Sequence, residues 1–135
     1  MFRSVLEGIA MTMKNHARAM CDEMGVPLTK MVVSGGGSNG DLFMQILSDV
    51  FGVPAHRNMV NGAAGLGAAI CVALGLGVYK DRQDAVNHMV HKRDTFMHQK
   101  KNTELYHKIN TQVYQQIVRT TDDLLIKSHQ IFNPG

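Results

Sequence analysis

The sequence predicts an α/β fold that is rich in helix, with a short buried strand near its centre. Residues 31–33 are apolar and partly β-branched, which is typical of a buried strand. Three consecutive glycines follow at 35–37, and from about Asn39 apolar residues recur every three or four positions, as on one face of a helix. We therefore expect a strand, a glycine turn and a helix N-terminus in this order, with the other elements arranged around them.

A long helix is expected to precede this strand. Ser4 and Glu7 have the spacing of a capping box at its start, and its apolar residues form one stripe. Gly25 is placed to end the helix in the left-handed conformation, and Pro27 follows two residues later. One face of this helix should therefore cover the core.

The helix after the glycine turn is expected to end at Gly52. Ser38 or Asn39 can cap its start, because Ser38 and Asp41 also have capping-box spacing. Residues 53–57 then form a short extended segment.

A helix of unusually small residues is expected at 61–74. Gly65 and Gly67 within it would each cost about 1 kcal/mol relative to alanine, which indicates close packing against another backbone. The C-terminal part predicts a shorter helix at 81–89, then a connector or a weak strand at 91–97. A final long helix is expected to be capped by Asn102 or Thr103.

Composition and charge exclude several classes of function. The chain has 135 residues, of which 44% are hydrophobic and 19% are charged, as in one globular domain. The net charge of +3 is spread out, whereas nucleic-acid binding needs a dense basic face with aromatic partners. No apolar run is long enough for a membrane span. Cys21 and Cys71 are isolated, so no disulfide framework is expected and a cytoplasmic location fits.

The glycine turn is the strongest candidate for a binding site. Glycine admits positive φ and close approach of a ligand to the backbone, and the free amides of a helix N-terminus favour an anion. The stretch is not a P-loop, because no Gly-Lys-Ser/Thr follows, and it does not match the dinucleotide-binding fingerprint. On the residues alone, a phosphate site and a tight turn without a ligand both stay open.

Other chemistries lack the patterns that they require. Seven histidines are present, but none stands with a partner at the spacing of metal ligands. No serine lies in a nucleophile elbow, and no catalytic triad is found. We therefore expect neither catalytic nor metal-binding residues in this chain.

Residues 34–49, together with 51–54 and 65–69, resemble the C-terminal domain of the FGGY carbohydrate kinases, the family of the glycerol, xylulose, ribulose and gluconate kinases. Residues 3–10 resemble the helix that precedes the strand in the same family, so the resemblance covers nearly the whole chain. It implies a ribonuclease H-like fold of the actin and hexokinase type, of which residues 1–135 form the C-terminal half as a single domain. It also implies a second strand at 53–57, parallel to the first in a βαβ core.

The resemblance implies transfer of a phosphoryl group from ATP to a sugar or polyol hydroxyl, with Mg²⁺ bridging the phosphates. The family's catalytic aspartate belongs to an N-terminal domain that this chain lacks, so the chain alone is expected to be inactive. The expected partners are that missing N-terminal domain and a sugar or polyol. A stand-alone phosphate-binding or nucleotide-binding module, or a homodimer, is the alternative.

The resemblance also places a nucleotide half-site on the glycine turn. Gly36 matches a position whose backbone lies against the phosphates. Gly40 replaces an Asn or Ser that contacts adenosine, which leaves Asn39 as the available substitute. The helix at 61–74 matches one that shapes the adenine end, although close packing without a ligand is a simpler use for its small residues. The expected nucleotide-binding residues are Gly35, Gly36, Gly37, Ser38, Asn39 and Gly40.

Overall fold

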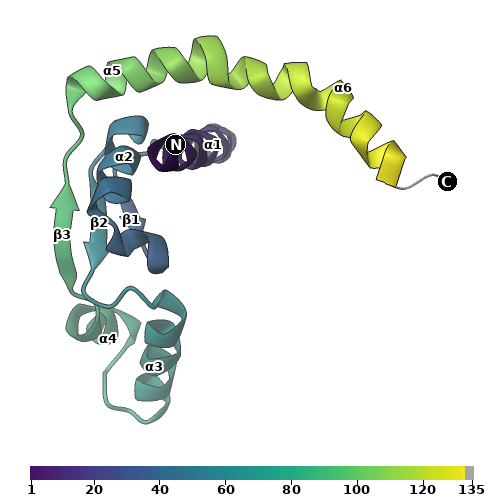
Figure 1. The fold of residues 1–135 in the computed structure, drawn as a ribbon. Coiled ribbons are helices and arrows are strands. Elements are labelled where there is room, and N and C mark those ends of the chain that lie inside the picture. The colour runs from purple at the N-terminus through teal and green to yellow at the C-terminus, as the bar shows by residue number, and fades with distance from the viewer. Residues whose placement is uncertain (133–135) are drawn as a thin grey trace.

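The computed structural model describes residues 1–132, apart from the side chains of residues 118 and 119, as helices arranged around one small sheet (Figure 1). The elements in chain order are α1 (Phe2–Met24), β1 (Met31–Val33), a 3₁₀ turn (Gly36–Asn39), α2 (Asp41–Phe51), β2 (Ala55–Asn58), α3 (Ala63–Gly75), α4 (Arg82–Met89), β3 (Lys92–Phe96), α5 (Lys100–Ile109), a π-helical segment (Asn110–Tyr114) and α6 (Gln115–Phe132).

The sheet has the strand order β1-β2-β3 and is mixed. β1 and β2 are parallel, with Met31 opposite Ala55, and α2 connects them along the chain. The expected parallel βαβ unit is therefore confirmed. β3 pairs antiparallel to β2, with Phe96 opposite Ala55, so residues 91–97 contribute a strand rather than a connector.

The core lies where α1, α2 and α5 meet, above the sheet in the view of Figure 1. Helices α1 and α2 lie side by side, and α5 passes across them. The buried residues that form this core are Ala10, Met11, Ile46, Leu47, Val50 and Tyr106. The packing of these three helices therefore supports the connection between β1 and α2.

Both glycines that were predicted to end helices do so. Gly25 ends α1 with φ of 65°, and Gly52 ends α2 with φ of 74°. These are left-handed conformations, which glycine adopts without the steric penalty of a Cβ.

The predicted cap of α1 is wrong. The helix begins at Phe2, so Ser4 lies inside it and its hydroxyl donates to the carbonyl of Met1 at 2.6 Å. Glu7 instead contacts Arg3 and Tyr106. A tertiary partner therefore uses the side chain that the local pattern assigned to the cap.

The predicted cap of the last long helix is also wrong. That helix begins at Lys100, so Asn102 and Thr103 lie in its first turn. The buried carboxylate of Asp49, on α2, accepts from the Gln99 amide at 2.7 Å and from Asn102 Nδ2 at 2.8 Å. The start of α5 is thus stabilised from a neighbouring helix.

Helix α3 has the expected position but not the expected packing. None of its residues is buried, and a Cβ on Gly65 or Gly67 would meet no atom within 4 Å. Within residues 1–132, the predicted close packing of these glycines is therefore wrong. The helix lies beside α4, at the end of the molecule away from α5 (Figure 1).

Helix α6 continues the line of α5 and extends beyond the rest of the molecule (Figure 1). Its apolar side chains Ile117, Leu124, Leu125, Ile126, Ile131 and Phe132 are exposed. In the part of the chain that the structure describes, no helix has both the length and the apolar composition that crossing a membrane would require.

Candidate functional site

The glycine turn connects β1 to α2 and is closed by backbone hydrogen bonds. Gly35 has φ of 86°, a conformation that favours glycine, and its amide donates to the carbonyl of Asn61 at 2.7 Å. The Ser38 amide donates to the Gly35 carbonyl at 3.1 Å, and the Gly40 amide to the Gly37 carbonyl at 3.3 Å. The turn therefore has a defined 3₁₀ conformation that ends at the start of α2.

Two amides of this turn stay open. Among the described residues, the amides of Gly36 and Gly37 have no hydrogen-bond acceptor. A Cβ on Gly36 would meet no atom within 4 Å, whereas one on Gly37 would lie 3.3 Å from the ring of Phe43. Gly37 thus has a packing reason to be glycine, while Gly36 faces open space that another group can enter.

Ser38, Asn39 and Gly40 have different environments. Ser38 is buried, and its hydroxyl donates to the Gly35 carbonyl at 2.7 Å, so its side chain stabilises the turn from within. Asn39 is exposed, and its Oδ1 accepts from Asn61 Nδ2 at 2.8 Å. Gly40 is the N-cap of α2 and supplies no side-chain cap, so the expectation that Ser38 or Asn39 caps this helix is wrong.

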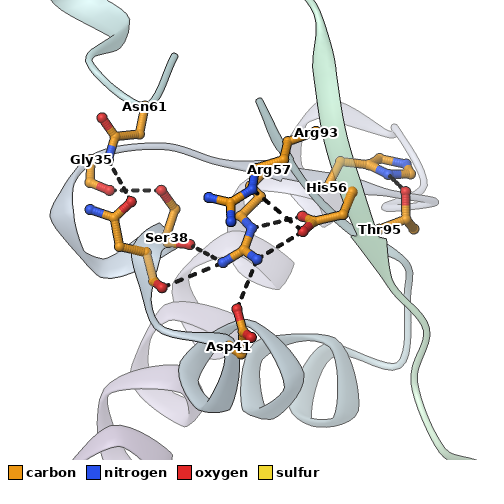
Figure 2. Close-up of polar contacts among 10 residues, drawn as sticks. Gly35, Ser38, Asp41, His56, Arg57, Asn61, Arg93 and Thr95 are labelled. Atoms are coloured by element: carbon orange, nitrogen blue, oxygen red, sulfur yellow. Dashed lines mark hydrogen bonds and ion pairs between the residues drawn. The ribbon is translucent and has the colours of Figure 1, made fainter. Parts of the chain in front are cut away.

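Arg57, which the sequence analysis did not single out, lies beneath the turn (Figure 2). Its side chain is 5% exposed. Nη1 donates to the carbonyl oxygens of Ser38 at 2.9 Å and Asn39 at 3.5 Å, and Nη2 lies 2.8 Å from Asp41 Oδ1. One guanidinium on β2 therefore contacts both the end of the turn and the first residue of α2.

Asp94, on the neighbouring strand β3, orients this arginine. Nε of Arg57 donates to Asp94 Oδ1 at 2.7 Å and Nη2 to Oδ2 at 2.8 Å, and the guanidinium carbon lies 5.0 Å from the centre of the Phe96 ring. These hydrogen bonds lower the pKa of Asp94 and raise the pKa of Arg57. The one sequence signal for Arg57 is its spacing of two from buried Ala55, which places both on the same face of β2.

An apolar groove of about 440 Å³ borders the open side of the turn. It lies between α1, the turn and the start of α2, and is lined by Phe2, Leu6, Ile9, Gly36, Gly37, Gly40, Leu42 and Phe43. Open amides and a large apolar surface therefore adjoin each other at Gly36. Within residues 1–132, no group of three His, Cys, Asp or Glu side chains is arranged to hold a metal ion.

A known protein family matches the part of the chain that carries these features. The model of the C-terminal domain of the FGGY family of carbohydrate kinases matches residues 1–76, which include the turn, Arg57 and all of α3. The chain belongs to this family. The FGGY domain is 44% identical to the sugar kinase YgcE of Escherichia coli K12 over 132 residues, which is 98% of this chain and 27% of that relative. The chain thus spans about a quarter of that relative's length.

Solved structures share the fold. The FGGY domain aligns with the ligand-bound xylulose kinase from Lactobacillus acidophilus at a TM-score of 0.77 and 19% identity, over 87% of this chain and 23% of that one. It aligns with the glycerol kinase from Plasmodium falciparum, solved with ADP, at a TM-score of 0.69 and 22% identity, over 84% of this chain and 23% of that one. The expected ribonuclease H-like fold is confirmed.

Proposed function

We propose that this chain is the C-terminal part of an ATP-dependent sugar or polyol kinase, and that it forms a single domain over residues 1–135. The observation that carries the proposal is the family match over residues 1–76, which contains the open glycine turn. The relative YgcE is about four times as long as the matched segment, which supports an N-terminal kinase domain as the partner of this one. The two free cysteines agree with a cytoplasmic location.

The nucleotide half-site is the turn itself. Gly36 and Gly37 present open amides at the start of α2, where donors and the helix dipole both favour phosphate oxygens. Open space over Gly36 allows the close approach that such contacts need. Gly35 sets the turn, Ser38 holds it from within, and Asn39 and Gly40 form its exposed end.

The apolar groove gives the nucleotide a second type of contact. A flat aromatic base packs well on apolar side chains, and pockets for such ligands combine an apolar lining with a few placed polar groups. Gly36 and Gly40 belong to the turn and also line the groove. A base in the groove would therefore lie next to phosphates bound on the turn.

The domain's contribution to phosphoryl transfer is positioning and charge stabilisation, which dominate this chemistry. Backbone donors aimed at the phosphates hold the nucleotide without a catalytic side chain of this chain. Mg²⁺, when bound, would neutralise phosphate charge. Because none of the proposed nucleotide-binding residues at 35–40 is a carboxylate, we assign the protein ligands of Mg²⁺ to the N-terminal domain.

An assay of the complete gene product that carries this chain tests the proposal. Purified protein is incubated with Mg-ATP and a panel of sugars and polyols, and ADP release and phosphorylated product are both measured. We expect at least one carbohydrate to be phosphorylated stoichiometrically with ADP release. ATP hydrolysis without any phosphorylated product, or no ATP use across the panel by a folded protein, would contradict the proposal.

A further inference from the structure

We propose that Arg57 is a positioning residue for the nucleotide turn, held in place by Asp94. Within residues 1–132, Arg57 makes no hydrogen bond to Gly36 or Gly37. It contacts instead the carbonyl oxygens of Ser38 and Asn39, at the end of the turn, and the carboxylate of Asp41, the first residue of α2. This inference rests on the proposed function in one respect, which is that the ligand of the turn is a nucleotide.

The turn benefits from such a support because its glycines are costly to order. Glycine loses more conformational freedom on ordering than any other residue, and residues 35–37 are all glycine. Within the turn the Ser38 and Gly40 amides close the chain over distances of 3.1 and 3.3 Å. The bond from Arg57 to the Ser38 carbonyl, at 2.9 Å, is charge-assisted and therefore stronger than either amide bond, and it adds to the 2.7 Å bond from the Ser38 hydroxyl to the Gly35 carbonyl.

The same arginine also offsets the negative charge of Asp41 next to the turn. Asp41 lies in the first turn of α2, and its carboxylate would repel a phosphate bound at this helix N-terminus. Arg57 Nη2 pairs with that carboxylate at 2.8 Å. The positive charge of Arg57 thus pairs with both Asp41 and Asp94, and Figure 2 shows its guanidinium between Asp41 and Ser38 of the turn.

Only an arginine can make this set of contacts. A guanidinium has five donors in one plane, and those of Arg57 are directed to Asp94, Asp41 and the turn carbonyls together. A lysine keeps the charge but has a single nitrogen, so it cannot reach the turn and pair with Asp94 in the same way. Arg57→Lys is therefore the variant that separates geometry from charge.

The test compares Arg57→Lys and Asp94→Asn with wild type by amide hydrogen exchange without any nucleotide. The probes are the hydrogen-bonded amides of Ser38 and Gly40, and the reference is Leu47 in the core of α2. Arg93→Gln is the matched control, because Arg93 is exposed and its Nε lies 3.8 Å from the same Asp94 carboxylate. A second readout is the affinity of each variant for Mg-ADP, from the amide shifts of Gly36 and Gly37.

In both variants we expect amide exchange at Ser38 and Gly40 to accelerate about tenfold or more relative to Leu47, because a charge-assisted hydrogen bond is lost or weakened. The affinity for Mg-ADP should fall by a similar factor. Arg93→Gln should match wild type. Unchanged relative exchange at the turn in Asp94→Asn and Arg57→Lys would overturn the inference, whatever their affinity for ADP. Faster turn exchange with no ADP binding even by wild type would uphold Arg57 as the support of the turn and reject its nucleotide ligand.

Discussion

The amide of Gly35 donates to the carbonyl of Asn61 at 2.7 Å, and the side chain of Asn61 donates to Asn39 Oδ1 at 2.8 Å. Asn61 leads directly into α3, so one residue joins both ends of the glycine turn to the start of this helix. Helix α3 buries none of its residues, yet its N-terminus is held beside the turn. The glycine turn and the start of α3 therefore share one anchor.

Gly36→Ala should separate binding from stability. A Cβ at this position meets no atom within 4 Å, so we expect the free energy of unfolding to change by less than about 0.5 kcal/mol. The same methyl group occupies the space through which a phosphate approaches the turn. The affinity for Mg-ADP should therefore fall about tenfold or more. A fall of this size corresponds to the free energy of roughly one hydrogen bond to a charged group. Calorimetric unfolding and nucleotide titration measure the two effects.

Gly75→Ala is the control for that variant. Gly75 is the last residue of α3, and a Cβ there also meets open space. It should leave Mg-ADP affinity near the wild-type value, and it should keep the stability or raise it by up to about 1 kcal/mol, because alanine favours the helix. Unaltered ADP affinity in Gly36→Ala would show that the backbone of residue 36 does not contact the ligand.

Gly52→Ala should destabilise the fold. Gly52 has φ of 74°, and a Cβ there would lie 2.9 Å from Cγ2 of Thr103 on α5. The left-handed conformation costs about 1–2 kcal/mol for a residue with a Cβ, and the clash adds to it. Urea unfolding, followed by circular dichroism, measures the loss.

Gly25→Ala isolates the clash. Gly25 has a similar φ of 65°, but a Cβ on it would meet nothing within 4 Å. Its loss should be limited to the conformational part of about 1–2 kcal/mol, and so be smaller than that of Gly52→Ala. Equal losses in the two variants would mean that α5 does not pack on the end of α2 at Thr103.

The hydroxyl of Tyr106 should stabilise the contact between α5 and α1. It donates to Glu7 Oε1 at 2.7 Å and accepts from Arg3 Nη2 at 3.3 Å, and Tyr106 is buried. We expect Tyr106→Phe to lower the free energy of unfolding by about 1–2 kcal/mol. Tyr79→Phe is the control, because the half-buried ring of Tyr79 stacks on His88 and its hydroxyl has no hydrogen-bond partner among residues 1–132. A loss of the same size in both variants would contradict this account of Tyr106.

Acid should weaken the pair formed by Arg57 and Asp94. Hydrogen bonding to Arg57 lowers the pKa of Asp94 in the folded chain below that in the unfolded chain. The stabilisation is then fully present above the unfolded pKa, about 3.9, and is lost as pH falls through the folded value. The difference in unfolding free energy between wild type and Asp94→Asn should be constant from neutral pH to about 5 and shrink below about 4. A difference that does not change down to the lowest pH at which the chain folds would argue against the pair.

The elements that the sequence predicts correctly are those whose signals are local. The run at 31–33, the glycines that end α1 and α2, and the helical spacing within α2 each depend on residues a few positions apart. The turn that we assign to the nucleotide belongs to this group, because its strand, glycines and helix are contiguous. Its position could therefore be predicted without a structure.

The missed features depend on partners that are distant in sequence. The carboxylate of Asp49 caps α5 from α2, fifty positions before Gln99, and so displaces the cap that Asn102 predicts. Arg57 pairs with Asp94 across the sheet and with Asp41 across the turn. Neither pairing leaves a periodic pattern in the sequence. The composition of α3 predicts burial, but composition does not say which surface covers a helix.

The most direct test of the account is a titration of this chain with Mg-ADP, followed by the backbone amide resonances. We expect saturable shifts at Gly36, Gly37 and Asn39 and at the start of α3, with a dissociation constant near the millimolar range, since half of a typical micromolar binding free energy corresponds to about −4 kcal/mol. Because this chain spans only about a quarter of the length of the relative YgcE, tighter binding is not required. A folded chain whose turn resonances do not shift as Mg-ADP rises through the millimolar range, or whose shifts all lie away from the turn, would contradict the assignment of the glycine turn as a nucleotide half-site.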